Sequence, residues 1–310
     1  MKSYAIFSGS ANPALAAAIA DGLDVRLTPC SVERFPDGEI SIQLDESVRR
    51  RDVFIIQPTC PPVNDRIIEL LAFADACRRA DAAHITAIIP YFGYSRSDRR
   101  AGRREPIMAT MMADLMQSAG IGHVVTIDIH TPQVEGFFRI PMDDLTAGPT
   151  LAASLHDDLP EDAVVVAPDL GAVKRATIYS TLLKRPTAIL HKRRRSGSEV
   201  EISQVIGEVR GRSCIIVDDM ISTGGTIAEA INALRNEGAN PDFTVVATHG
   251  VFTEGARARL TAAGAGRVIV SDTIPADHAD WPELRVVSVA PLIATALKRM
   301  AAGESLRGIA

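Results

Sequence analysis

The sequence predicts an α/β fold built on parallel sheets. Short apolar runs alternate with segments of helical period along almost the whole chain, and the connections between them are short. Most of these runs are continuously apolar, without a polar residue at every second position. This pattern is typical of strands that are buried on both faces of a parallel sheet.

The candidate strands fall in both halves of the chain. They are 4–8, 39–44, 52–57, 85–90, 124–129, 163–167, 187–191, 214–217, 244–247, 268–271 and 286–289. An undivided sheet of this many strands is unusual, so we expect two domains.

Helices are predicted between these strands. Asn64 and Asp65 can cap a helix that runs to about residue 80. Pro106 is expected to open a second helix that Gly120 closes, and a third helix follows Thr226.

The polar stretch 154–162 indicates a domain boundary near residue 148. The expected domains are therefore 1–148 and 149–290. The final segment, 291–310, contains a helix that fits either domain, and we assign it to the first.

Composition and charge exclude several classes of protein. The chain has 310 residues, is 46% hydrophobic and carries a net charge of −5, which disfavours a partner such as nucleic acid or a membrane surface. Two basic clusters, five arginines within 96–104 and the run 192–195, fit a compact polyanion such as a nucleotide.

The cysteine pattern and the N-terminus fit a cytoplasmic protein. The four cysteines are scattered, so we expect reduced and mostly buried thiols. No apolar stretch approaches the roughly 20 residues that cross a bilayer. The first residues run directly into a predicted strand, without the features of a signal peptide.

The segment 214–226 is the most informative in the chain, because it joins an apolar strand to two acidic residues, a loop and a helix. Gly224 and Gly225 can adopt backbone angles closed to other residues and let the chain approach a ligand closely. Backbone N–H groups of the loop and of the helix N-terminus then attract an anion. Hydroxyl donors are added by Ser222, Thr223 and Thr226. A phosphate monoester fits this loop.

Asp218 and Asp219 stand together at the end of the strand. Two neighbouring carboxylates repel each other, so a buried pair needs donors or cations, and vicinal sugar hydroxyls or a Mg²⁺-bound phosphate would supply them. The alternative is an acidic strand end followed by an ordinary glycine turn, and the complete string favours the ligand site.

This segment resembles the 5-phosphoribosyl 1-diphosphate-binding signature of the type I phosphoribosyltransferase fold. The resemblance implies that 222–226 holds a ribose 5-phosphate group and that Asp218 and Asp219 orient the ribose hydroxyls. It does not distinguish the transferases, which consume this compound, from the synthetase that makes it.

The rest of the chain resembles the ribose-phosphate pyrophosphokinase family from end to end, through the segments 7–13, 34–39, 61–71 and 90–100. The resemblance implies two type I phosphoribosyltransferase-like domains, each a mainly parallel sheet flanked by helices. It implies transfer of the β,γ-diphosphoryl group of Mg-ATP to the C1 hydroxyl of ribose 5-phosphate. The products would be 5-phosphoribosyl 1-diphosphate and AMP, for nucleotide, histidine and tryptophan biosynthesis.

The segment 34–39 is similar to a family hairpin that reaches into the ATP site of a neighbouring subunit. Phe35 would stack on adenine, while Asp37 and Glu39 would accept hydrogen bonds from its amino group or fix the loop. A homo-oligomer with a shared ATP site follows, of an order that one sequence does not define. Taken alone, this segment is a common Pro-Asp-Gly turn.

The same resemblance supplies further ATP-binding residues. Arg96 would hold the ATP phosphates with its planar guanidinium fork, next to Ser97 and Asp98. His130, in a motif that closes a strand, would help to hold a Mg²⁺ ion that also touches ATP. Asp169 would be the second Mg²⁺ ligand, directly or through water.

Lys192 and Arg194 match the family residues that meet the transferring diphosphoryl group, and 195–199 is a candidate lid. Without the resemblance, this basic run could be a localisation tag, but its position after a buried strand argues against that.

Several positions depart from the family pattern. Ser97 replaces a common Gln, which leaves donor selectivity open, and Ser222 replaces an Asp found in many members. Pro132 replaces a hydroxyl residue of a regulatory anion site, and the chain ends before a tail that contributes to it, although Ser47 and Arg49 are retained. Phosphate activation and ADP inhibition are therefore left open.

Two other functions compete with the synthetase. A phosphoribosyltransferase would need only the 218–226 segment, and not the second α/β half with its ATP-site motifs. A non-catalytic regulatory subunit would not need the complete set of catalytic and metal-binding residues.

Overall fold

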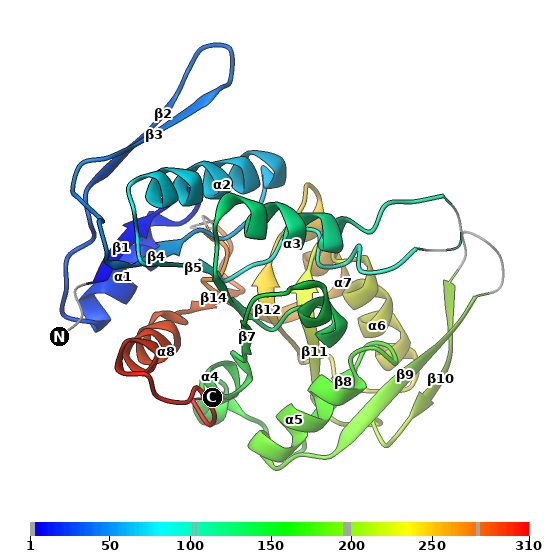
Figure 1. Ribbon diagram of the computed structural model, residues 1–310. Helices are drawn as coiled ribbons and strands as arrows, with labels where there is room; N and C mark the ends of the chain where they lie inside the picture. Colours follow the sequence, from blue (N-terminus) through cyan, green and yellow to red (C-terminus); the bar gives the residue numbers. More distant parts are fainter. Residues whose placement is uncertain (1–3, 101, 103, 195–199, 277–279, 310) are drawn as a thin grey trace. The chain divides into compact units, whose positions relative to one another are not determined.

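The computed structural model describes residues 4–100, 102, 104–194, 200–276 and 280–309, and of residues 157, 192–194 and 200–203 it describes the backbone alone (Figure 1). The predicted lid, 195–199, lies outside the described residues. The chain forms two compact units. The first comprises Met1–Thr146, Thr273–Pro275 and Ser288–Ile309, and the second comprises Ala147–Asp272 and Ala276–Val287.

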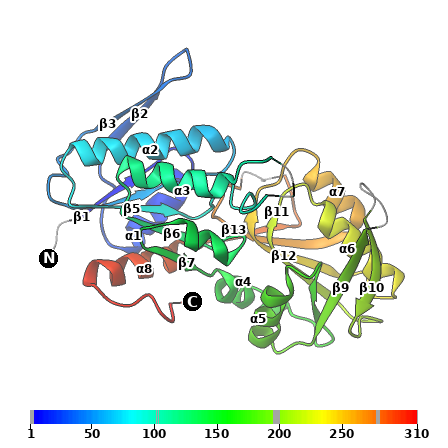
Figure 2. The same cartoon turned by 45° about the vertical axis from the view of Figure 1, so that its right-hand side comes forward.

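The first unit is built on a five-stranded sheet in which all neighbouring strands are parallel. Its strands, in spatial order, are β1 (Tyr4–Ser8), β4 (Asp52–Ile56), β5 (His84–Ile89), β6 (His123–Ile127) and β7 (Met142–Leu145). Helices cover both faces of the sheet (Figures 1 and 2). One face carries α2 (Val63–Arg79) and α3 (Met108–Ala119), and the other carries α1 (Pro13–Gly22) and α8 (Ala290–Ala302).

A separate antiparallel hairpin belongs to this unit. It consists of β2 (Cys30–Arg34) and β3 (Ile40–Leu44), paired from Cys30 with Leu44 to Arg34 with Ile40. The base of the hairpin packs on the core of the unit through apolar side chains of both strands. Its tip extends beyond the helices of the first unit (Figure 1).

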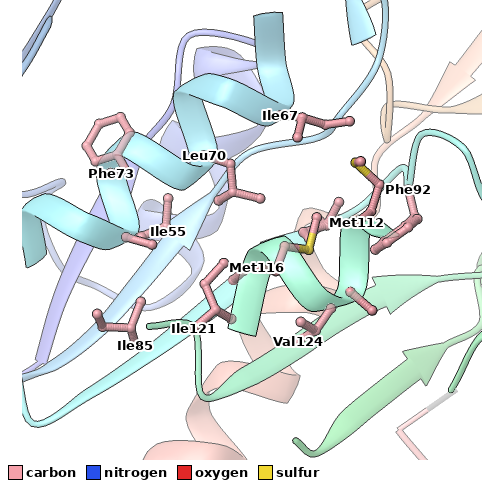
Figure 3. Close-up of a cluster of buried hydrophobic side chains, with 14 of the residues drawn as sticks. Ile55, Ile67, Leu70, Phe73, Ile85, Phe92, Met112, Met116, Ile121 and Val124 are labelled. Atoms are coloured by element: carbon pink, nitrogen blue, oxygen red, sulfur yellow. The ribbon is translucent and has the colours of Figure 1, made fainter. Parts of the chain in front are cut away.

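One core cluster of the first unit lies between the sheet and the α2–α3 pair (Figure 3). Leu70 and Phe73 of α2 are fully buried against the strands, and Met112 and Met116 of α3 fill the space beside them. Leu70 and Phe73 lie three residues apart, the spacing that places side chains on one face of a helix.

The second unit is built on a seven-stranded sheet with helices on both faces (Figure 2). Its strands, in spatial order, are β10 (Val200–Ile206), β9 (Thr187–Arg194), β8 (Val164–Ala167), β11 (Cys214–Ile221), β12 (Phe243–Gly250), β13 (Ala265–Ser271) and β14 (Leu284–Val287). All pairs are parallel except β9 with β10. Its helices are α4 (Gly148–Ala153) and α5 (Val173–Leu183) on one face, and α6 (Gly225–Asn236) and α7 (Ala256–Ala263) on the other. Two 3₁₀ helices complete the elements, η1 (Pro132–Phe137) and η2 (His156–Asp158).

The predicted parallel α/β fold is confirmed, with three strands more than the sequence predicted. β2, β7 and β10 are the additional strands, and each occupies an edge or hairpin position where polar residues interrupt the apolar pattern.

The predicted cap of α2 is wrong. The N-cap position is Pro62, which makes no side-chain hydrogen bond to the helix. Asp65 instead forms an ion pair with Arg34 of the hairpin, at 3.0 Å. In contrast, Gly120 ends α3 in the left-handed conformation, as predicted.

The prediction of reduced cysteines is confirmed, since all four are free. Burial raises the pKa of the Cys77 and Cys214 thiols to about 12, so both stay protonated and unreactive at neutral pH. In the part of the chain that the structure describes, no helix has the length and apolar character needed to cross a membrane.

Candidate active site

The strand order of the second unit defines where a ligand can bind. From β8 the chain continues to β9 on one side, whereas from β11 it continues to β12 and β13 on the other side. The connection after β8 runs through α5, and the connection after β11 runs through α6 on the opposite face. The carboxyl ends of β8 and β11 therefore flank a topological switch point, where open α/β sheets bind their ligands.

The two carboxylates predicted to bind ribose lie on β11 at this switch point. The strand runs to Ile221, four residues further than predicted, so both aspartates lie within it rather than after it. The Asp219 backbone N–H donates to Asp218 Oδ1 at 2.9 Å, and Asp219 is only 6% exposed. Arg175 of α5 places its Nη1 atom 3.9 Å from Asp218 Oδ1.

Burial raises the pKa of the Asp218 carboxyl well above its ordinary value, and the neighbouring Asp219 raises it further. Arg175 and the Asp219 backbone N–H act in the opposite direction, and they do not cancel the effect. The site therefore holds a carboxylate that needs additional donors when it is ionised, and sugar hydroxyl groups are donors of this kind.

The predicted phosphate loop follows directly and leads into α6. Gly224 is the N-cap residue of α6, in the left-handed conformation with φ +74°, and no side chain caps the helix. Because Gly224 has no side chain, the N-cap residue supplies no acceptor to the first N–H groups of α6, and this helix end is suited to bind an anion. Within the loop, Thr223 Oγ1 accepts from the Gly225 N–H at 3.3 Å.

A segment around α7 supports this loop from one side. Thr253 donates to the Ser222 carbonyl twice, through its backbone N–H at 3.0 Å and through Oγ1 at 3.3 Å. Arg259 of α7 donates to the Thr223 carbonyl through Nη1. Phe252 donates to the Ile221 carbonyl at 3.0 Å. No sequence motif pointed to these supporting residues, because their role depends on tertiary contacts.

The only tryptophan of the chain lies between β13 and β14 and packs against the supporting segment. Trp281 is 3% exposed and packs edge-on against the Phe252 ring, with the ring centroids 5.1 Å apart. Trp281 thereby contacts Phe252, the residue whose N–H donates to the Ile221 carbonyl just before the predicted phosphate loop.

In the first unit, predicted ATP-site residues gather at the carboxyl edge of its sheet. The loop after β5 carries Arg96, which is exposed, and Asp98, which is buried. Asp98 accepts hydrogen bonds from Thr131 Oγ1 at 2.7 Å and from Gln133 Nε2 at 2.8 Å. These bonds connect the loop after β5 to the segment after β6, in which Thr131 directly follows His130.

The structure gives Ser97 a local role. Its Oγ accepts from the Met108 N–H at 3.2 Å, and its carbonyl accepts from the Ala109 N–H at the same distance. Ser97 thus satisfies backbone donors at the start of α3, and Asp98 joins two loops. Both side chains already have protein partners, whereas Arg96 extends into solvent.

The predicted Mg²⁺ ligands belong to different units. His130 is exposed and lies after the end of β6 in the first unit. Asp169 is half-buried after β8 in the second unit, and its Oδ1 atom accepts from the Ala172 N–H at 3.1 Å. Among the described residues, no group of three or more His, Cys, Asp or Glu side chains could hold a metal ion. The Asp169 carboxylate fits Mg²⁺ bound with ATP, because this ion usually takes one or two carboxylates and completes its shell with phosphates and water.

The predicted adenine-binding residues lie at the tip of the β2–β3 hairpin. Phe35 is 41% exposed, and Asp37 and Glu39 are exposed as well. Asp37 Oδ1 accepts from the Glu39 N–H at 3.1 Å, and Gly38 adopts φ +94°, so the turn is well defined. The tip presents an aromatic ring away from the core of its own unit.

The two predicted catalytic residues lie on β9. Lys192 pairs with Ile202 of β10, and Arg194 pairs with Val200, in an antiparallel ladder at the edge of the sheet. Their side chains are outside the described part of the structure.

Comparison with known proteins identifies the family. Residues 4–120 match the N-terminal domain of ribose phosphate pyrophosphokinase, and residues 199–309 match the phosphoribosyl synthetase-associated domain. The ribose-phosphate pyrophosphokinase of Caldanaerobacter subterraneus subsp. tengcongensis is 45% identical over 98% of this chain and 96% of its own length. The chain belongs to the ribose-phosphate pyrophosphokinase family.

Other members of the family are similarly close. The ribose-phosphate pyrophosphokinase of Chromobacterium violaceum is 44% identical over 98% of this chain and 94% of its own length. The crystal structure of phosphoribosylpyrophosphate synthetase from Mycobacterium smegmatis matches with a TM-score of 0.90 and 41% identity, covering 97% of this chain and 100% of the other. The predicted family and fold class are thus confirmed.

The raised pKa of Asp218 leads to a test by pH. Because the folded protein holds this proton more tightly than the unfolded chain, stability is lost as the pH rises from about 4 towards the raised value. Asp218→Asn removes this loss, so we expect its Tm to exceed that of the wild type at pH 8. The difference should disappear below about pH 4, where the carboxyl is protonated in both states.

The matched control is Glu208→Gln, which changes an exposed carboxylate of the same unit. Differential scanning calorimetry of both variants from pH 4 to pH 8 measures the effect. A Tm difference between Asp218→Asn and wild type that stays constant over this range would contradict the assignment.

The conformation of Gly224 leads to a second test. A Cβ atom at this position would lie 3.2 Å from Leu260 Cγ, and the left-handed backbone would be strained as well. We expect Gly224→Ala to lower the free energy of unfolding by about 1–2 kcal/mol. The control is Gly225→Ala, whose Cβ would meet only Thr223 Oγ1 at 3.5 Å. Urea titrations that give equal losses for both variants would disprove a special role for Gly224.

Proposed function

We propose that this chain transfers the β,γ-diphosphoryl group of ATP to the C1 hydroxyl of ribose 5-phosphate. The products are 5-phosphoribosyl 1-diphosphate and AMP, which places the enzyme at the entry to nucleotide, histidine and tryptophan biosynthesis. Membership of the ribose-phosphate pyrophosphokinase family carries this conclusion. The single structural observation behind it is the carboxylate pair on β11, followed by the glycine-containing loop into α6, at the switch point of the second sheet.

The second unit binds ribose 5-phosphate in this proposal. The 5-phosphate lies at the N-terminus of α6, where N–H groups and the loop hydroxyls of Ser222, Thr223 and Thr226 donate to it. Asp218 and Asp219 accept from the ribose hydroxyls. These donors lower the free energy of the ionised pair and offset the burial and the repulsion by Asp219 that raise the pKa of Asp218 in the free protein.

ATP is held by residues of the first unit and by the hairpin of a neighbouring subunit. The exposed guanidinium of Arg96 binds phosphate oxygens, and Phe35 stacks on the adenine. Asp98 and Ser97 contribute by fixing the loop that carries Arg96, which the hydrogen bonds of both residues support. Because the hairpin tip faces away from its own core, we propose a homo-oligomer in which subunits share the ATP site.

Mg²⁺ is the proposed cofactor, with His130 and Asp169 as its protein ligands. When bound, the ion neutralises charge on the ATP phosphates. The remaining chemistry is positioning and stabilisation of charge, since the C1 hydroxyl attacks the β-phosphorus in line and the enzyme need form no covalent intermediate. Lys192 and Arg194 stabilise the charge that develops on the equatorial phosphate oxygens.

We also propose that the two units are the two phosphoribosyltransferase-like domains and that the protein is cytoplasmic. The phosphoribosyltransferase alternative is disfavoured, because both family matches and the similarity of the whole chain belong to pyrophosphokinases.

The decisive assay combines the protein with Mg²⁺, ATP and ribose 5-phosphate and follows AMP and 5-phosphoribosyl 1-diphosphate. Formation of both products in equal amounts is expected. Replacing Lys192 by Ala should lower kcat by a factor of about 100 or more and change the KM for ribose 5-phosphate only modestly.

The control for this variant is Arg193→Ala, since the mechanism gives the intervening residue no role. Near-wild-type turnover of Lys192→Ala would remove Lys192 from the catalytic group. A failure of the wild type to form either product, with ATP or with another nucleoside triphosphate, would contradict the proposed reaction.

A further inference from the structure

The supporting segment around α7 fixes the direction of the phosphate-loop peptides. The carbonyls of Ser222 and Thr223 both accept hydrogen bonds from this segment, from Thr253 and Arg259 respectively. In a planar trans peptide the C=O and the following N–H point in opposite directions. The N–H groups of Thr223 and Gly224 therefore point away from α7.

Arg259 also changes the strength of one of these donors. Its guanidinium is the charged donor to the Thr223 carbonyl, and a charge-assisted bond of this kind is stronger than a neutral one. Polarisation of the carbonyl strengthens the N–H on the other side of the same peptide, which is the N–H of Gly224. The positive charge itself adds to the attraction for an anion near the loop.

Close packing holds α7 against the loop. A Cβ atom on Gly224 would lie 3.2 Å from Leu260 Cγ and 3.4 Å from the Ala256 carbonyl, and both residues belong to α7. The loop backbone at Gly224 therefore lies directly against α7, and the Arg259 bond fixes the orientation of the Thr223–Gly224 peptide at this contact.

We infer that Arg259 is a positioning residue for ribose 5-phosphate, acting through the Thr223–Gly224 peptide to direct a backbone N–H at the 5-phosphate. The inference rests on the proposed function, since it concerns how the same loop binds its substrate. Arg259 acts from behind the loop, so it affects binding of the phosphorylated sugar and leaves the binding of ATP and the transfer step unchanged.

The same helix supplies a matched control. Arg257 lies two residues earlier on α7, is exposed, and also donates to a backbone carbonyl through its guanidinium. Its acceptor is the carbonyl of Asp280, which is not part of the phosphate loop. Replacing either arginine by Gln removes one charge and one bond to a carbonyl from the same helix.

The test is isothermal titration of ribose 5-phosphate into the full-length wild type and the variants Arg259→Gln, Arg259→Lys and Arg257→Gln, together with steady-state kinetics. We expect Arg259→Gln to raise the Kd and the KM for ribose 5-phosphate about tenfold, with kcat and the KM for ATP within about twofold of wild type. Arg259→Lys, which keeps the charge, should recover most of the affinity, and Arg257→Gln should bind as the wild type does.

Three outcomes would overturn the inference. Wild-type affinity in Arg259→Gln would show that the loop needs no such support. Equal weakening in Arg257→Gln and Arg259→Gln would assign the effect to α7 as a whole. A wild type that neither binds ribose 5-phosphate nor forms product would overturn the proposed function, and the inference with it, and this result is distinct from the first two.

Discussion

Parallel pairing of strands is the constraint on which the rest of this structure depends. Parallel pairing places the carboxyl ends of the paired strands at the same edge of a sheet, so residues far apart in sequence meet there. In the second unit this edge combines the ends of β8 and β11 at a reversal of strand order. In the first unit the strands follow one another in a single direction from β1 to β7, without such a reversal. The proposed sugar-binding residues of β11 and its following loop accordingly lie in the second unit.

The geometry of the site places opposing electrostatic demands on one strand. Burial and the adjacent Asp219 disfavour ionisation of Asp218 on β11, while the loop that follows leads into a helix N-terminus that attracts negative charge. A substrate that carries hydroxyl groups at one end and a phosphate at the other satisfies both demands at once. Without a ligand, the carboxylate pair thus makes the folded protein less stable than it would be with uncharged residues there, which is common in ligand-binding sites.

The sequence predicted those strands and turns that are encoded by residues adjacent in the chain. Apolar runs located the buried strands, and the glycines at 224 and 225 indicated the turn that leads from β11 into α6. The edge strands β2 and β10 were missed, because exposed strands need no continuous apolar run. The roles of Asp98 and Arg259 were beyond sequence reasoning, since hydrogen bonds to Thr131 and to the Thr223 carbonyl exist only after the chain folds.

The position of Trp281 gives the protein a built-in optical reporter. Because the chain has no other tryptophan, emission excited at the red edge of its absorption arises from one place in the second unit. The indole ring contacts Phe252, whose N–H holds the carbonyl of Ile221 at the start of the phosphate loop. A ligand that binds the loop after β11 alters the surroundings of the indole, so occupancy of the proposed sugar site can be followed in solution without a label.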